Sequence, residues 1–131
     1  MPDDEFVPYD LSLQMKELGF NYSTFAYSTV NKKKNIEFRH SVIFVNHNSL
    51  EHRVSNPLFQ QAFEWFRENK KLMCQIEKGE NSENYYPVID GVSHKFDRTM
   101  WFDTYRLGEL ACIKKLIELV KEQNDDKKNT K

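Results

Sequence analysis

Apolar residues recur every three or four positions in three separated segments, residues 10–18, 56–70 and 104–123. This spacing places apolar side chains on one side of a helix. The longest stripe belongs to the last segment and contains Leu107, Leu110, Ile113, Leu116, Ile117 and Val120. The pattern therefore predicts three amphipathic helices, each with one face to bury.

Residues that favour helix ends flank the first two segments. Asp10 can accept hydrogen bonds from the free amides of the first helix, and Gly19 supplies the left-handed residue that ends it. Asn56 followed by Pro57 is a typical start for the second helix, because asparagine caps helices and proline suits their first turn. The sequence therefore predicts the ends of these helices as well as their faces.

The third helix has two candidate caps, Thr104 and Asp103. Gly108 follows within the first turns, where glycine costs about 1 kcal/mol relative to alanine. A tight crossing of this helix over a sheet would explain a glycine at that position.

Four other segments are rich in β-branched and aromatic residues or alternate apolar with polar positions. They are residues 24–30, 36–46, 72–79 and 84–92. A polar stretch joins the members of each pair, so two antiparallel hairpins are predicted. Pro87 lacks a backbone donor, so its strand should lie at a sheet edge or be interrupted there.

The pattern within residues 36–46 changes along the strand. One face carries Ile36, Phe38, His40, Val42 and Phe44, and the other carries Glu37, Arg39, Ser41, Ile43 and Val45. Since the second face turns apolar towards Val45, we expect that end of the strand to be buried on both sides.

The element order is helix, hairpin, helix, hairpin, helix. Hairpins pair antiparallel, and three amphipathic helices need an apolar sheet face to cover. We therefore expect an α+β fold with a mainly antiparallel four-stranded sheet covered by the helices. Residues 1–123 should form a single globular domain, which suits a chain of 131 residues, and residues 124–131 a flexible polar tail.

The second helix carries four aromatic rings in fifteen positions. On a helical wheel, Phe59, Phe63 and Phe66 fall within one apolar arc and are predicted to face the core. Trp65 lies at the border of this arc. Either it packs in the core, or it contacts a neighbouring element or a partner.

Composition and charge exclude several classes of protein. The chain is 39% hydrophobic and 30% charged, which is typical of a soluble globular domain. Its net charge of −1 provides no global attraction for nucleic acid or an anionic membrane, so neither is expected as a partner. Without a long apolar segment or a signal peptide, a cytoplasmic location is expected, in the host cell if the gene belongs to a phage.

Cysteine and histidine give little support to a reactive or metal site. Cys74 and Cys112 belong to no CxxC pair and are expected to be reduced, packed thiols. Three imidazoles, those of His40, His47 and His52, could gather around a metal ion, but no carboxylate or thiol stands at ligand spacing. No metal site is therefore predicted.

Two histidines have an acidic neighbour that suits general acid–base work. These pairs are His94 with Asp97 and His52 with Glu51. Nothing in the sequence directs them to a common point, and with four glycines in the chain no Gly-rich phosphate loop is present. No catalytic residue is assigned.

Aromatic residues also cluster before the second strand of the second hairpin and before the last helix. They are Tyr85, Tyr86, Trp101, Phe102 and Tyr105. These rings either fill the end of a core or, together with Trp65, line a pocket or a partner interface. Arg98 and Arg106 flank them and could hold an anion such as phosphate.

Three segments resemble an uncharacterised family of small proteins of phages and prophages of Bacteroides-type bacteria. They are YDLSLQMKELGF at 9–20, PLFQQAFEWFREN at 57–69 and YRLGELACIKKLIELVKE at 105–122, and their order and spacing fit as well. The family has no assigned activity, so the resemblance implies an intracellular phage accessory protein and no catalytic residue.

Two functional hypotheses follow. The first is a non-enzymatic binding protein that engages a host or phage protein or a second copy of itself. It rests on the lack of a catalytic arrangement and on the loop aromatics. The alternative is a binder of, or an enzyme acting on, a nucleotide-like anion held by Arg98 or Arg106 beside the rings. No cofactor is expected in either case.

Overall fold

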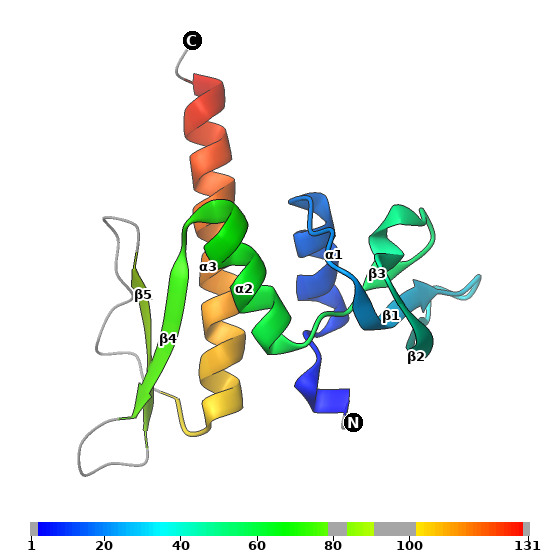
Figure 1. Cartoon of the computed structure of the whole chain (residues 1–131), viewed down its shortest axis with the longest axis horizontal. Helices are drawn as coiled ribbons and strands as arrows, with labels where there is room; N and C mark the ends of the chain where they lie inside the picture. The colour runs from blue at the N-terminus through cyan, green and yellow to red at the C-terminus, as the bar shows by residue number, and fades with distance from the viewer. Residues whose placement is uncertain (1–2, 79–83, 91–101, 130–131) are drawn as a thin grey trace. The chain divides into compact units, whose positions relative to one another are not determined.

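The computed structural model describes residues 3–78, 84–90 and 102–129 (Figure 1). The backbone forms two compact units, Met1–Ala62 and Phe63–Lys131, and each is described by itself. Within the described residues the architecture is α+β, as expected, with three α-helices and two antiparallel sheets. The predicted single four-stranded sheet is wrong, because the two sheets have three and two strands.

The first sheet contains a short strand that was not predicted from the sequence. Strand β3, Val54–Ser55, pairs antiparallel with β1, Thr24–Val30, and β1 also pairs with β2, Ile36–Val45. The order is β2-β1-β3, so β1 is the central strand and β2 and β3 are the edges of this sheet. The second hairpin forms a separate two-stranded sheet from β4, Met73–Lys78, and β5, Tyr85–Asp90.

The helices begin within about three residues of their predicted limits, and α1 and α2 also end close to them. They are α1, Tyr9–Glu17, α2, Phe59–Lys70, and α3, Tyr105–Asn129, with short 3-10 turns η1 at Asp3–Glu5 and η2 at His47–Ser49. The end of α1 is confirmed: Gly19 has a φ of +100°, and the amide of Phe20 donates to the carbonyl of Met15 at 3.0 Å. Its predicted cap is wrong, because Pro8 takes the cap position and no side chain bonds there.

Asn56 also differs from its prediction as a helix cap. Helix α2 begins at Phe59, and the side-chain oxygen of Gln61 accepts from the amide of Leu58 at 3.0 Å. The buried Asn56 amide instead donates to the carbonyl of Val7 at 3.0 Å and accepts from the Ser28 hydroxyl at 2.5 Å. Because a buried amide needs partners, Asn56 joins the start of α1 to β1.

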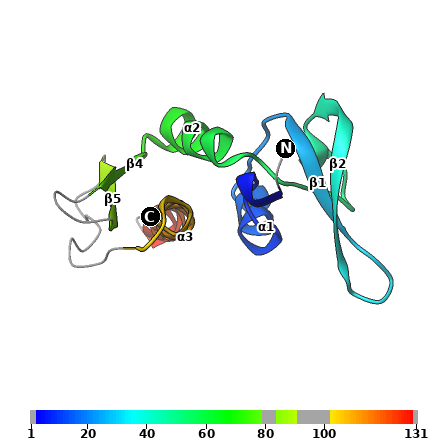
Figure 2. The same cartoon turned by 90° about the horizontal axis from the view of Figure 1, so that it is seen from below.

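The first hairpin is confirmed, and Figure 2 shows its two strands side by side with the turn that joins them. The prediction that β2 is buried on both sides near Val45 is wrong. The register pairs Ala26 with His40 but Thr24 with Val45, so one residue of β1 faces a bulge of residues 41–44 on β2. This bulge leaves the ladder, and its side chains therefore reach solvent instead of a core.

The second unit packs α3 along its two-stranded sheet (Figure 1). A Cβ added to Gly108 would lie 3.4 Å from Cγ2 of Ile76 and 3.8 Å from Cβ of Tyr85, which confirms the close helix–sheet crossing. The Thr104 hydroxyl accepts from the amide of Leu107 at 3.1 Å, so Thr104 is the cap. Pro87 sits opposite Ile76 in a sheet where both strands are edges, as its missing donor requires.

The buried side of α3 differs in part from the predicted stripe. Ile113, Leu116, Ile117 and Val120 are buried, together with Cys112 and Leu119. Leu107, predicted to belong to the stripe, is 46% exposed because it lies in the first turn of the helix. Helical backbone continues to Asn129, into the stretch expected to be a tail, and the single domain expected over residues 1–123 stays a prediction.

The two cysteines correct another expectation. Cys74 on β4 and the fully buried Cys112 on α3 form a disulfide, although the sequence predicted two separate thiols. Their separation of 38 residues gave no spacing signal, and only the packing of helix on sheet brings the sulfurs together. Disulfides are rare in the cytosol, so this bond weighs against the cytoplasmic location, which stays a prediction.

Candidate functional site

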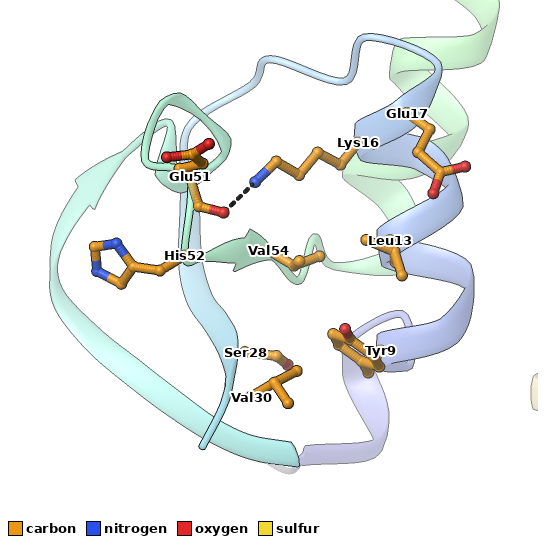
Figure 3. Close-up of a pocket in the computed structure, with 9 residues that line it drawn as sticks. All are labelled: Tyr9, Leu13, Lys16, Glu17, Ser28, Val30, Glu51, His52 and Val54. Atoms are coloured by element: carbon orange, nitrogen blue, oxygen red, sulfur yellow. Dashed lines mark hydrogen bonds between the residues drawn. The ribbon is translucent and has the colours of Figure 1, made fainter. Parts of the chain in front are cut away.

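A cavity of about 490 Å³ lies in the first unit where α1 faces β1 and β3 (Figure 3). Its walls are Tyr9, Leu13, Lys16 and Glu17 of α1, Ser28 and Val30 of β1, Val54 of β3, and Glu51 and His52 of the preceding loop. The apolar side chains of Leu13, Val30 and Val54 form part of the wall, and the polar groups lie around them. The chemistry available to this cavity therefore depends on what those polar groups already bind.

Lys16 is committed to the backbone of the loop before β3. Its ammonium nitrogen donates to the carbonyls of Arg53 at 2.7 Å, Leu50 at 3.2 Å and Glu51 at 3.4 Å, the last of which is drawn in Figure 3. An ammonium has three donors, so these carbonyls can accept all of them. Lys16 thus fastens this loop to α1 and has no donor left over for an anion in the cavity.

Three further polar residues of the cavity, His52, Glu51 and Ser28, form no catalytic arrangement with one another. The His52 ring points away from α1 and the Glu51 carboxylate lies apart from it (Figure 3). The Ser28 hydroxyl donates to Asn56, so no base activates it as a nucleophile. The His52 and Glu51 pair considered from the sequence is therefore not assembled here.

A second feature of the first unit is an apolar surface at the bulge of β2. We call it the bulge surface and define it as Phe25, Val42, Ile43, Phe44 and Val45. These residues are 41%, 103%, 61%, 51% and 39% exposed, respectively. The rings of Phe25 and Phe44 stack at 4.4 Å with an interplanar angle of 20°. Adjacent exposed side chains of this size are unusual on a soluble monomer and typically mark an interaction surface.

Paired charges occupy the other half of β2. The guanidinium of Arg39 donates to the carboxylate of Glu37 at 2.7 Å, and the amide of Asn31 adds a bond at 3.3 Å. These contacts, the Arg39 hydrogen bond first, hold the pKa of Glu37 below its ordinary value. The hydrogen bond to Glu37 in turn raises the pKa of Arg39. Both side chains are solvent-exposed, so the pair itself adds little to stability.

A buried histidine lies behind the hairpin. The ring of His47 is 1% exposed and stacks on that of Tyr27 at 4.6 Å, while the guanidinium of Arg53 lies 4.2 Å from the Tyr27 ring centre and 3.2 Å from Nδ1 of His47. Since Arg53 can only donate, Nδ1 accepts and the neutral ring carries its proton on Nε2. Burial is the main cause that lowers the pKa of His47, and the charge of Arg53 lowers it further. A smaller effect of the Ile43 backbone acts in the opposite direction.

Trp65 lies in the core. It is 2% exposed and its ring meets that of Phe66 edge-on at 5.0 Å, with the Lys70 ammonium 5.5 Å from the ring centre. Phe59 and Phe66 are also buried, as predicted, and Phe63 is half-buried. The buried side of α2 is therefore wider than the apolar arc predicted on the helical wheel, and it includes Trp65 at the border of that arc.

The other predicted binding residues divide between described and undescribed positions. Tyr85 and Tyr86 are half-buried on β5, and the Tyr85 ring meets Tyr105 edge-on at 5.8 Å. Arg106 bonds the buried carboxylate of Glu109 at 2.9 Å, so an anion would have to compete with that carboxylate. Two further candidates, Arg98 and Trp101, lie outside the described residues, as do His94 and Asp97. Their role in binding stays a prediction.

No metal site is formed by the described residues. The chain between residues 3 and 78 and the two later described segments hold no group of three or more His, Cys, Asp or Glu that could bind an ion. Of the three histidines considered, His40 packs its ring against Phe6 at 5.5 Å and His47 stacks on Tyr27. Among the described helices, none has the length and apolar character needed to cross a membrane.

Comparison with known proteins returned no match to a family model, a curated protein or a solved structure. The bulge surface is the feature that reasoning from the sequence missed. Its signal was present as four consecutive apolar residues, 42–45, but such a run is equally typical of a buried strand.

Proposed function

We propose that this chain is a small non-enzymatic binding protein that holds a partner protein on the bulge surface. The observation that carries the proposal is the exposure of Val42, Ile43 and Phe44 next to Phe25. Burying such side chains stabilises a complex by about 25 cal/mol per Å² of apolar area, before the cost of association. A partner with a complementary apolar surface would be stabilised on this chain by covering these side chains.

Two further observations support a binding role over catalysis. Two polar groups of the cavity of the first unit are already bound, Lys16 to three backbone carbonyls and Ser28 to Asn56. Arg106, proposed for the alternative anion site, faces Glu109. The resemblance of the three helical segments to phage proteins supports a role as an accessory factor that engages a host or phage protein.

Affinity capture with matched variants tests the proposal. Tagged wild-type chain would be incubated with lysate of Bacteroides-type cells carrying related phages, beside Val42→Asp/Ile43→Asp and the control Leu107→Asp. Leu107 is a comparably exposed apolar residue of the second unit, at 46%. We expect one protein to be retained by wild type and control and to fall about tenfold or more with the double variant, as at hot spots of protein interfaces.

Two results would overturn the proposal. One is that no protein is retained by wild type above background at low or moderate salt. The other is equal retention by the double variant. Circular dichroism must show that the double variant keeps the melting temperature of the wild type, which is expected because these side chains already face solvent.

A further inference from the structure

The Cys74–Cys112 disulfide lies where strand β4 crosses helix α3. Side chains alternate between the two sides of a strand, so Cys74 and Ile76 share one side of β4. Gly108 and Cys112 are four residues apart and share one side of α3. Ile76 faces Gly108, and the disulfide adjoins this contact. The bond therefore fastens the hairpin of β4 and β5 to the buried side of the helix.

The two sulfurs differ in their access to solvent. Cys112 is 0% exposed, whereas Cys74 is half-buried and has the exposed neighbours Met73 and Gln75. The contact between Sγ of Cys74 and the carbonyl oxygen of Gln75, at 4.0 Å, also lies on the exposed side. A thiolate that arrives from solvent can therefore reach Cys74, but it cannot reach Cys112 while the second unit is folded.

This difference decides how the bond can be exchanged. In thiol–disulfide exchange a thiolate attacks one sulfur and the other sulfur leaves. Attack on Cys74 forms a mixed disulfide there, breaks the bond to Cys112 and releases Cys112 as a thiolate, which then takes up a proton. The released sulfur stays next to the mixed disulfide at a high effective concentration. It can attack Cys74 again and expel the incoming thiol, so a reductant with a single thiol is readily returned.

A reductant with two thiols escapes this reversal. Its second thiol attacks the reductant sulfur of the mixed disulfide, closes a disulfide within the reductant and releases Cys74 as a thiol. In total, the dithiol is oxidised by two electrons to a disulfide, and the Cys74–Cys112 bond is reduced to two thiols. The buried position of Cys112 thus selects the class of reductant as well as the sulfur that is attacked.

We propose that the Cys74–Cys112 bond is a redox switch of the second unit, opened by a dithiol reductant that attacks Cys74 and expels Cys112. In the oxidised state the bond fixes the hairpin on α3. In the reduced state packing alone holds it there, and a two-stranded hairpin has little stability of its own. The bond lies in the second unit and the bulge surface in the first, so the switch does not depend on the proposed function.

Two single-cysteine variants compare the access of the sulfurs. Cys112→Ala keeps Cys74 and Cys74→Ala keeps Cys112, and both variants lack the bond. N-Ethylmaleimide at neutral pH should alkylate Cys74 about tenfold or more faster than Cys112, because the folded chain shields a buried thiol. Circular dichroism before alkylation verifies that both variants are folded. Equal rates of alkylation in the two folded variants would contradict the proposal.

The oxidised wild-type chain provides a measurement that needs no substitution. Brief treatment with reduced glutathione, followed by N-ethylmaleimide and peptide mapping, should place glutathione on Cys74 and maleimide on Cys112. Glutathione mainly on Cys112 would overturn the proposal. At the same concentration of thiol, dithiothreitol should open the bond completely while glutathione leaves most of it closed. Equal opening by the two reagents would exclude the selection of a dithiol.

A switch must also close again. After removal of dithiothreitol, oxidised glutathione should restore the bond: the Cys74 thiolate attacks it and releases one glutathione, and the Cys112 thiolate then displaces the other. This sequence is the monothiol reaction in reverse. A reduced, folded chain that keeps two free thiols in oxidised glutathione would exclude a reversible switch.

Leu119→Ala distinguishes attack on the folded chain from attack after unfolding. Leu119 is 3% exposed on α3, about two turns beyond Cys112, and alanine there lowers the stability of the second unit. Attack on the folded chain predicts that dithiothreitol opens the bond within about twofold of the wild-type rate, in proportion to its concentration. Leu107→Ala, at an exposed leucine of the same helix, is the control. A rise of about tenfold or more in Leu119→Ala alone would show that the bond opens only after unfolding, which refutes the proposal.

Discussion

The hydroxyl of Ser28 donates to the side-chain oxygen of Asn56 at 2.5 Å, and both residues are 1% exposed. The nitrogen of the same amide reaches the carbonyl of Val7 and, at 3.3 Å, the hydroxyl of Ser12. One asparagine side chain therefore satisfies polar groups from β1, from α1 and from the segment before it.

Asn56→Ala leaves a buried hydroxyl and a buried carbonyl with fewer partners. We expect the free energy of unfolding of the first unit to fall by about 2–3 kcal/mol. Urea unfolding followed by circular dichroism measures the loss. Asn21→Ala, at an exposed asparagine, is the control and should change it by less than about 0.5 kcal/mol. A loss for Asn56→Ala as small as that of the control would contradict the structural role.

Gly108 faces Ile76 closely enough to limit its side chain, but it leaves room for a methyl group. Gly108→Ala should leave the free energy of unfolding unchanged or raise it by up to ~1 kcal/mol, because alanine favours the helix and its Cβ lies 3.4 Å from Ile76. Gly108→Val should lower it by about 1–3 kcal/mol through overpacking. Thermal unfolding compares the two variants.

Two companions identify the cause of the Gly108→Val effect. Glu122→Val places the same residue at an exposed position of α3 and reports its intrinsic cost in a helix. Adding Ile76→Ala to Gly108→Val should recover part of the stability, since it opens the space that valine needs. Additive losses in that double variant would show that the two residues do not meet.

The Cys74–Cys112 bond closes a loop across a separation of 38 residues. Chain entropy predicts that its reduction lowers the stability of the second unit by about 3–4 kcal/mol. Thermal melts with and without reductant measure the shift, and Cys74→Ser should melt like the reduced wild type. Thiol titration of the denatured, unreduced protein should detect no free thiol. Two titratable thiols in freshly purified protein would contradict the bond.

His47 should make stability depend on pH in a defined direction. Its folded-state pKa lies below the ordinary 6.5, so the unfolded chain binds a proton first as pH falls. The contribution of the neutral His47 ring to the free energy of unfolding is therefore fully present above about pH 6.5 and is lost as the pH falls below that value. Urea unfolding at about pH 7.5 and about pH 5.5 measures the difference in the free energy of unfolding between the two conditions. His47→Gln should reduce this difference, whereas His52→Gln, at an exposed position, should preserve it.

Signals that act over a few residues were readable from the sequence. Gly19 ended α1, Thr104 capped α3, and alternation placed both hairpins. Asn56 shows the limit of such reasoning, because its neighbour Pro57 suggested a cap while its actual partners lie 28 and 49 residues away in sequence. Those long-range contacts decide the role of the side chain, and no local pattern encodes them.

The candidate surfaces were less predictable than the fold. The apolar run 42–45 predicted a strand end that is buried on both sides. The change of register between the pairs Ala26–His40 and Thr24–Val45 shows instead that residues 41–44 bulge out of the ladder. The sequence left two alternatives for Trp65, packing in the core or contact with a neighbouring element or partner. A helical wheel gives the direction of a side chain, but it does not show how deeply the surrounding residues bury it.

The covalent link between β4 and α3 has a consequence for proteolysis. A protease that cuts the backbone once anywhere between residues 75 and 111 would leave the two fragments attached through sulfur. Such a nicked chain would run as one species on a gel without reductant and as two species with it. Cleavage within this stretch would therefore not by itself release α3 from the rest of the molecule.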